Sequence, residues 1–283
     1  MANGKQKKGA SKKKSAVAAA RGSVVAKKQV PWGTIIAVIG IVLLAAGVFT
    51  YYYVASGDQR AQREREEAAA SFAPSEDNPD PSTDIEGVVT EEYEAGAHVL
   101  PHERVAYDQT PPFGGPHDGY WAACNGIVYP EPVRNENMVH SLEHGAVWIA
   151  YDPERIQGED LEQLKLRVEG KPFTMMSPYP GLDSPISLQA WGRQLKVDSV
   201  TDERIDQFIA ALRRNPNTYP EIGASCDALG PGMFDPDNPP PFNPDPPGPD
   251  AKPMDYKGSA GARQGDMGSV GGQSTPEAPP AEE

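Results

Sequence analysis

The chain of 283 residues has few cysteines and lacks several common functional patterns. No glycine-rich segment has the spacing of a phosphate-binding loop, since "GGPHDG" fits no such pattern, which argues against nucleotide binding. The net charge of −14 makes the folded region acidic, so its surface repels phosphates and nucleic acid is not an expected partner. An apolar run long enough to cross a membrane occurs once, which predicts a tether and not a channel or transporter.

Acidic side chains are absent from residues 1–31, which contain eight lysines and one arginine. The apolar segment from Trp32 to Val54 follows directly, and a helix of about 20 residues spans the hydrocarbon core of a bilayer. Basic residues mark the cytoplasmic side of such a helix. We therefore expect a single-pass protein of the cell membrane, with a basic cytoplasmic N-terminus, a transmembrane helix over residues 32–54 and an extracytoplasmic remainder.

A cleaved signal peptide is the alternative for this segment, because small residues at Ala55, Ser56 and Gly57 resemble a weak cleavage site. The apolar run is longer than the roughly 7 to 15 residues that are usual in a signal peptide, and its charged leader is long. These features favour an uncleaved anchor.

The two cysteines are Cys124 and Cys226. Two free buried thiols are one reading, but thiols outside the cytoplasm can oxidise, so we expect a disulfide between them. Closing so long a loop contributes roughly 3 to 5 kcal/mol by restricting the unfolded chain.

Composition divides the extracytoplasmic part into three regions. Residues 55–86 mix charges, alanine and proline and are expected to form a stalk and linker. Residues 87–229 have the size of one globular domain. Residues 230–283 are rich in proline, glycine and aspartate, and they predict a disordered tail because they offer no apolar face to bury.

The domain is expected to be a small α+β fold. Short apolar runs suited to buried strands occur at 146–151 and 173–177, and residues 186–197 read as a third strand. Apolar residues at helical spacing predict a helix over 159–168 and another that is capped by Thr201 and buries a stripe ending at Leu212.

Histidines are confined to one part of this domain, where they number five in total: His98, His102, His117, His140 and His144. Imidazole is a common neutral ligand for zinc and copper near pH 7. In "VHSLEHGAVWIAY", His140 and His144 lie one turn apart if the segment is helical, and they can then share one ion. Glu143 is a further candidate ligand, or it hydrogen-bonds a ligand imidazole.

The other histidines lie in loops. His117 follows "PPFGGP", whose glycines and prolines fix a close turn that can bring it to His140 and His144. His98 and His102 are also four residues apart, but Pro101 disfavours a helix between them, so they rank behind His117 as ligands. Copper and zinc both remain candidates.

Three thioethers bear on the choice of metal. Met138, Met175 and Met176 would favour copper(I) if they faced the histidines, although methionine in a strand usually fills a core.

Two further functions remain open. The histidines can be structural, packed on main-chain carbonyls, in a non-catalytic interaction module beside a membrane complex or the cell wall. Alternatively, "HSLEH" fits the H-x-x-E-H pattern of inverted zinc peptidases, in which the glutamate activates water. Gly145 and the strand-like segment after it cut the required helix short, so an enzyme is not the expected function.

The pieces "PPFGGPH", "WAACNGIVY", "VHSLEHGAVWIAY", "SPYPG" and "PEIGASC" resemble a family of actinobacterial membrane-anchored proteins, domain of unknown function 3105. The resemblance covers roughly residues 96–226. It implies one extracytoplasmic domain behind an N-terminal span, with His117, His140, Glu143 and His144 on the motif positions and Cys124 paired with Cys226. The family has no assigned activity, so the resemblance predicts architecture more than function.

Overall fold

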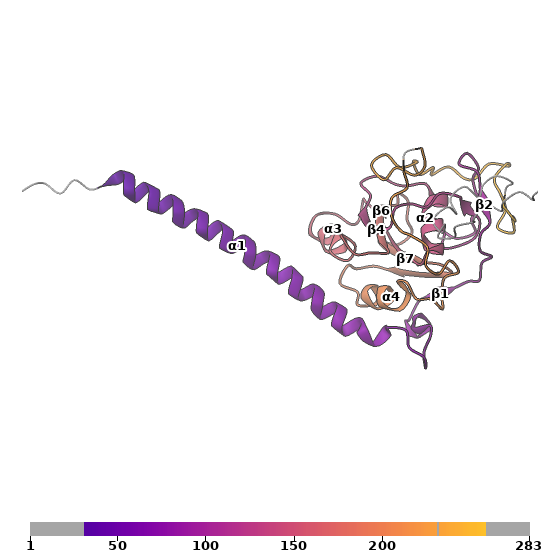
Figure 1. Cartoon of the computed structure of the whole chain (residues 1–283), viewed down its shortest axis with the longest axis horizontal. Helices are drawn as coiled ribbons and strands as arrows, with labels where there is room; N and C mark the ends of the chain where they lie inside the picture. Colours follow the sequence, from indigo (N-terminus) through magenta and orange to yellow (C-terminus); the bar gives the residue numbers. More distant parts are fainter. Residues whose placement is uncertain (1–30, 231, 259–283) are drawn as a thin grey trace, which may run out of the picture. The chain divides into compact units, whose positions relative to one another are not determined.

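The computed structural model describes residues 31–230 and 232–258, which form two compact units divided between Ala55 and Ser56. The basic N-terminus and residues 259–283 lie outside the described residues. The long helix α1 covers Trp32–Ala69 (Figure 1). Within it, Trp32–Tyr53 is long and apolar enough to cross a membrane, with a mean hydropathy of 2.4.

The second unit has the predicted α+β fold. Its helices are α2 (Asn135–Glu143), α3 (Gly158–Lys165) and α4 (Arg204–Leu212), with two short 3-10 helices at Ala70–Phe72 and Pro81–Asp84. Its strands are β1 (Val89–Thr90), β2 (His98–Val99), β3 (His117–Asp118), β4 (Asn125–Val128), β5 (Val147–Tyr151), β6 (Thr174–Pro178), β7 (Ile186–Ala190) and β8 (Arg193–Val197).

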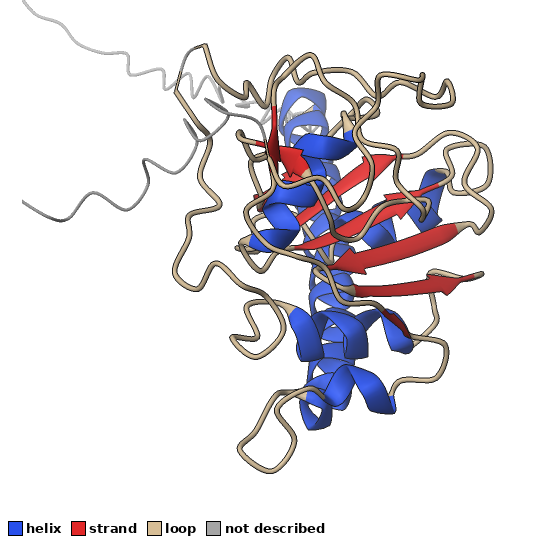
Figure 2. Cartoon of the chain, turned by 90° about the vertical axis from the view of Figure 1, so that its right-hand side faces the viewer, coloured by secondary structure: helices blue, strands red, loops and turns tan. Residues whose placement is uncertain are grey.

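Six strands form a mixed sheet in the order β1-β8-β7-β5-β6-β4, and β2 pairs with β3 in a separate two-stranded sheet. Strands β4, β6 and β5 are parallel, whereas β7, β8 and β1 add as antiparallel neighbours. Figure 2 shows the strands of the larger sheet side by side with helices on both sides.

The two crossover helices cover opposite faces of this sheet. The chain passes from β4 over β6 to β5 through α2, and then returns from β5 to β6 through α3. Crossovers of the same hand that run in opposite directions must lie on opposite faces. Accordingly Leu164 of α3 packs in one hydrophobic cluster with α4, while Leu142 of α2 packs in the other.

Strand β5 is buried on both faces, which explains why its sequence is a continuous apolar run. Val147, Ile149 and Tyr151 face the cluster with α3 and α4, whereas Trp148 and Ala150 face the cluster with α2. The sequence therefore indicated a buried strand correctly, and the alternation decides which residues lie near α2 and the histidines.

Two predicted elements differ in detail. Residues 186–197 are not one strand but the hairpin β7-β8, which turns at Gly192 with a φ of +69°. A Cβ at Gly192 would come within 2.5 Å of the carbonyl oxygen of Glu91, so only glycine fits there. Helix α4 begins at Arg204 with Glu203 at its N-cap position, so Thr201 does not cap it. The Asp202 carboxylate instead accepts a hydrogen bond from the Arg204 amide.

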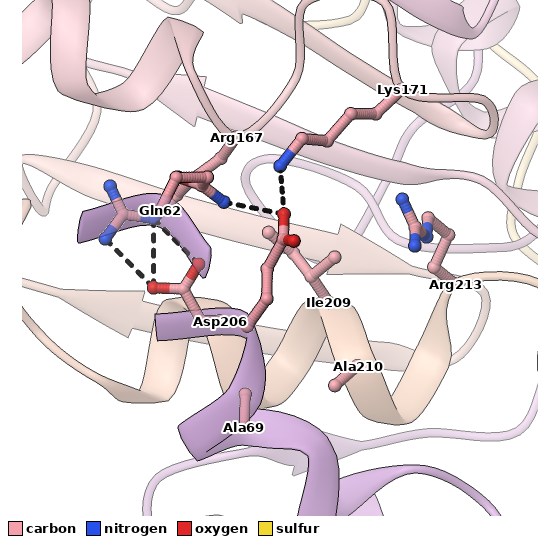
Figure 3. Close-up of a pocket in the computed structure, with 9 residues that line it drawn as sticks. Gln62, Ala69, Arg167, Lys171, Asp206, Ile209, Ala210 and Arg213 are labelled. Carbon is pink, nitrogen blue, oxygen red and sulfur yellow. Dashed lines mark hydrogen bonds and ion pairs between the residues drawn. The ribbon is translucent and has the colours of Figure 1, made fainter. Parts of the chain in front are cut away.

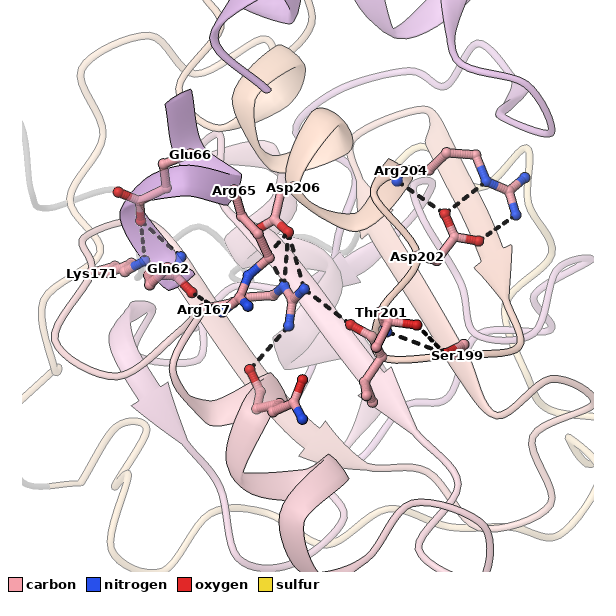
Figure 4. A network of polar contacts seen from close by, with 12 residues as sticks. Gln62, Arg65, Glu66, Arg167, Lys171, Ser199, Thr201, Asp202, Arg204 and Asp206 are labelled. Carbon is pink, nitrogen blue, oxygen red and sulfur yellow. Dashed lines mark hydrogen bonds and ion pairs between the residues drawn. The ribbon is translucent and has the colours of Figure 1, made fainter. Parts of the chain in front are cut away.

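The segment expected to be only a stalk and linker packs on the domain. Ile85 is 4% exposed and lies in the cluster with α4, and Phe72 packs against the same cluster. Close to it, Arg167 and Asp206 form a buried ion pair, to which Arg65 of α1 adds at 3.7 Å (Figure 4). A cavity of about 170 Å³ lies beside this pair and is lined in part by Lys171 (Figure 3). Lys171 forms an ion pair with Glu66 (Figure 4).

Part of the region expected to form the C-terminal tail lies against the domain. Residues 232–258 run over the surface of the domain, with Phe234 buried and Lys252 paired to Glu103. Pro241 forms an isolated antiparallel β-bridge with Val133. Because proline fixes φ, few such contacts are needed to hold a proline-rich backbone in one conformation.

Candidate metal centre

The histidines are positioned by α2 and by the small sheet of β2 and β3. His140 lies within α2 and His144 caps its C-terminus, so their rings are one turn apart with centroids 4.6 Å from each other. His98 of β2 is the direct partner of His117 of β3, which places their rings 4.9 Å apart. The His140 ring lies 5.0 Å from His98 and 4.8 Å from His117.

The end of α2 is fixed by Gly145. Its φ is +90°, and its amide donates to the Leu142 carbonyl, as is common where helices stop. A Cβ on Gly145 would come within 2.7 Å of the Tyr219 ring. This sharp stop sends the chain directly into β5 and leaves His144 at the last turn of the helix.

Main-chain carbonyls set the tautomer of three imidazoles. The Nδ1 atoms of His117, His140 and His144 lie 2.8, 2.6 and 2.6 Å from the carbonyl oxygens of Gly115, Asp118 and Ser225. A carbonyl oxygen only accepts, so each Nδ1 carries the hydrogen and donates it. In a neutral ring the lone pair is then on Nε2, the arrangement that is usual for metal-bound histidine.

Glu143 closes the group from the end of α2. Its Oε1 accepts a hydrogen bond of 2.7 Å from the Gly96 amide, and its Oε2 lies 2.8 Å from Nε2 of His117. Both side chains are fully buried. These two atoms form a buried ion pair while His117 is protonated, and both become available as ligand atoms once that proton is lost.

Two overlapping groups can hold a metal ion. We call His98, His117, His140 and Glu143 the inner site, and His140, His144 and Glu221 the outer site. Within each group the ligand atoms lie within 4.8 Å of one another. Ligands of one zinc ion at about 2.1 Å are at most about 4.2 Å apart, so the widest of these separations would have to shorten slightly when an ion binds.

The electrostatics differ between His117 and His140, the two central imidazoles of the inner site. Burial disfavours the charged form of His117, but the Glu143 carboxylate outweighs it and raises the pKa of the imidazole. Burial and the neighbouring imidazoles hold the pKa of His140 well below its usual range. Burial opposes ionisation of Glu143 as well, yet His117 and the Gly96 amide lower the pKa of that carboxyl. His140 is thus neutral and able to bind a metal.

The predicted site residues separate into two sets. His98, His117, His140, Glu143 and His144 come together, whereas His102 is exposed and belongs to neither group. The thioethers lie elsewhere: Met138 and Met175 are in the core with α2, and Met176 is in the core with α3 and α4. They fill cores, as methionines in strands usually do.

The expected disulfide joins Cys124 to Cys226. The amide of Cys124 also donates to the carbonyl of Cys226, so the segment 221–227 is held against the loop that follows β3. This segment supplies Glu221 and the Ser225 carbonyl, neither of which the sequence analysis identified. A signal was present, because both belong to "PEIGASC" and a bond from Cys226 to Cys124 brings that piece to His117.

The fold and site together define an α+β domain with a buried centre of three histidines and one carboxylate. Residues 98–228 match the sequence model of the family described as "Protein of unknown function (DUF3105)", and the domain belongs to this family. The matched segment contains every ligand of both sites. No curated protein and no solved structure matches the chain.

Proposed function

We propose that this domain binds one transition-metal ion, zinc or copper, at the inner site. One observation carries the proposal: three imidazoles and a carboxylate from separate segments lie together in the interior. Their exposed fractions are 3% for His98, 0% for His117, 1% for His140 and 0% for Glu143. Buried polar groups at such density need compensation, and a metal ion supplies it for all four at once.

The donor set supports zinc or copper(II) over copper(I). Copper(I) prefers thiolates and thioethers. The two cysteines are bonded to each other, and Met138, Met175 and Met176 lie in the hydrophobic cores. Imidazole nitrogen with one carboxylate oxygen suits zinc and copper(II). The ion would be held by the ε nitrogens of His117 and His140 and by the Glu143 carboxylate, with His98 as the remaining ligand.

The proposed setting is the outer face of a cell membrane. The helix Trp32–Tyr53 would anchor the chain, with the basic N-terminus in the cytoplasm by the positive-inside rule. A disulfide inside the domain is typical of an oxidising compartment, which supports placing the domain outside the cytoplasm. Metal handling beside the cell wall or a membrane complex follows from this placement.

The geometry argues against the peptidase hypothesis. A general base must reach a water molecule next to its substrate. Glu143 is instead fully buried, with one oxygen on the Gly96 amide and the other on His117. Helix α2 also ends at Glu143, which leaves no longer helix to hold the motif.

The proposal is tested by metal titration of the full chain in detergent after treatment with a chelator. We expect one zinc or copper(II) ion per chain, and we expect binding to be lost in His117→Ala, His140→Ala and Glu143→Gln. His102→Ala is the matched control and should bind as the unchanged protein does, because His102 is exposed outside both sites. Binding that persists in the combined variant His117→Ala/His140→Ala would overturn the inner site and leave a non-catalytic interaction module.

A further inference from the structure

The outer site differs from the inner site mainly in its access to solvent. His144 donates through Nδ1 to the Ser225 carbonyl and presents Nε2 to Glu221, whose Oε2 is 3.0 Å away. The Glu221 side chain is 30% exposed, whereas the side chains of His117 and Glu143 are fully buried. An ion that arrives from solvent therefore meets Glu221 first.

His140 belongs to both groups, and this is the observation that links them. Its Nδ1 is held by the Asp118 carbonyl, so it has one nitrogen, Nε2, to offer as a ligand. A single lone pair binds one ion at a time, and the two positions are therefore alternatives. Because each position lies about 2.1 Å from the same nitrogen, they are at most about 4.2 Å apart.

Packing, main-chain hydrogen bonds and a disulfide hold the residues of the outer site in place. Trp121 packs on the rings of both His140 and His144 and donates from its indole nitrogen to the Asp227 carbonyl. The amide of Glu221 donates to the Glu143 carbonyl at 3.3 Å, so main-chain atoms tie the two carboxylate ligands together. The Cys124–Cys226 disulfide fixes the same segment.

We propose that the outer site is the loading position for the inner site. A divalent ion binds first to Glu221, His144 and His140, and then exchanges Glu221 and His144 for Glu143, His117 and His98 while His140 stays bound. Where His117 is protonated, it loses that proton to solvent as its Nε2 becomes a ligand. Otherwise only ligand bonds are exchanged, and no redox change is involved. This inference rests on the proposed function, since it requires an ion in the inner site.

The exchange avoids an unfavourable intermediate. An ion that crossed Trp121 and the imidazole rings without ligands would lose its hydration before it gained protein donors, which is costly in a low-dielectric interior. With His140 shared, the ion keeps at least one protein nitrogen throughout and moves by a few ångström. Side-chain exposure falls from Glu221 to the fully buried Glu143, which also predicts that the loaded ion leaves slowly.

Stopped-flow uptake of zinc tests this step in the full chain in detergent, with a chromophoric chelator as the zinc donor. We expect Glu221→Gln to slow loading at least tenfold, while the loaded chain still holds one ion with a Kd within about threefold of the unchanged protein. Glu221→Asp keeps a carboxylate and should load at an intermediate rate. Glu131→Gln, an exposed carboxylate outside both sites, is the matched control and should load at the unchanged rate.

The outcomes separate the two proposals. If the unchanged chain binds no zinc, the proposed function fails and the loading position fails with it. If the unchanged chain binds zinc and Glu221→Gln loads equally fast, the loading position alone is overturned. Loss of equilibrium binding in Glu221→Gln as complete as in Glu143→Gln would also overturn it, because Glu221 would then be a resting ligand. Near-ultraviolet circular dichroism of each variant reports folding.

Discussion

Nε2 of His117 and Oε2 of Glu143 lie 2.8 Å apart with both side chains fully buried. Each residue uses its other polar atom on the main chain, His117 on the Gly115 carbonyl and Glu143 on the Gly96 amide. The pair thus holds two ligand atoms that face each other within the inner site. Its charge state and its occupancy by metal are coupled, and this coupling leads to the first two predictions.

Zinc should stabilise the fold through these ligands. A ligand that binds only the native state adds about 2.7 kcal/mol at a free concentration of 100 times its Kd. We expect thermal unfolding of the full chain to shift upward with zinc, and the shift to vanish in Glu143→Gln. An equal shift in Glu143→Gln would show that zinc acts elsewhere on the chain.

Metal binding should release a proton, since the pKa of His117 is raised and that of Glu143 is lowered in the metal-free protein. His117 is therefore protonated up to a pH above its ordinary range, and metal must displace this proton. The apparent affinity should fall about tenfold per pH unit as pH drops below the folded pKa of His117. Calorimetry in buffers of different ionisation enthalpy measures the protons released.

The effect of Glu143 on the pKa of His117 should also be measurable in the metal-free protein. In metal-free Glu143→Gln the carboxylate that raises the pKa of His117 is gone while burial remains, so the pKa of His117 should drop below its ordinary value. The stability that the raised pKa provides is present below about pH 6.5 and is lost as pH rises through the folded value. NMR titration of the His117 ring in both proteins checks this, and an unchanged pKa would contradict it.

The disulfide should matter for both stability and loading. Replacing Cys124 and Cys226 by serine should lower the free energy of unfolding by roughly 3 to 5 kcal/mol, because the bond closes a loop across 102 positions. Denaturant unfolding measures this change. In the same variant the segment that carries Glu221 is less restrained, so zinc uptake should slow, whereas unaltered uptake would show that the disulfide does not position Glu221.

The buried ion pair of Arg167 and Asp206 should contribute more than surface pairs do. Arg167 is 1% exposed and Asp206 is 6% exposed, and Asp206→Ala would leave the guanidinium charge buried without its main partner. We expect a loss of about 3 to 5 kcal/mol. Glu162→Ala, which removes an exposed pair with Lys165, is the control and should cost about 0.5 kcal/mol. Equal losses in urea unfolding would refute the difference.

The local elements could be predicted from sequence because their signals are local. The apolar run at 146–151 gave β5, and Gly145 gave the end of α2, since helix stops depend on one residue's backbone freedom. The turn at Gly192 was missed because no proline, asparagine or aspartate stands beside the glycine in "ISLQAWGRQLKV" to mark a turn. The packing of Ile85 and Phe234 was missed because their flanking segments are polar and proline-rich, and only tertiary contacts reveal what they bury.

The site was predictable in part for the same reason. The spacing of His140 and His144 placed them on one helix face, but the register of β2 against β3 that brings His98 to His117 depends on two-residue strands. No periodicity can be read from strands of that length. Glu221 reaches the site only through the fold around the disulfide.

The most direct measurement of the central claim is zinc K-edge X-ray absorption of the full chain loaded with one zinc ion. The account predicts three imidazole nitrogens and one carboxylate oxygen at about 2.0 to 2.2 Å. It also predicts that this shell is absent in His117→Ala, because that variant does not retain the ion. A first shell of sulfur or of water oxygens, or a shell that is the same in His117→Ala, would contradict it.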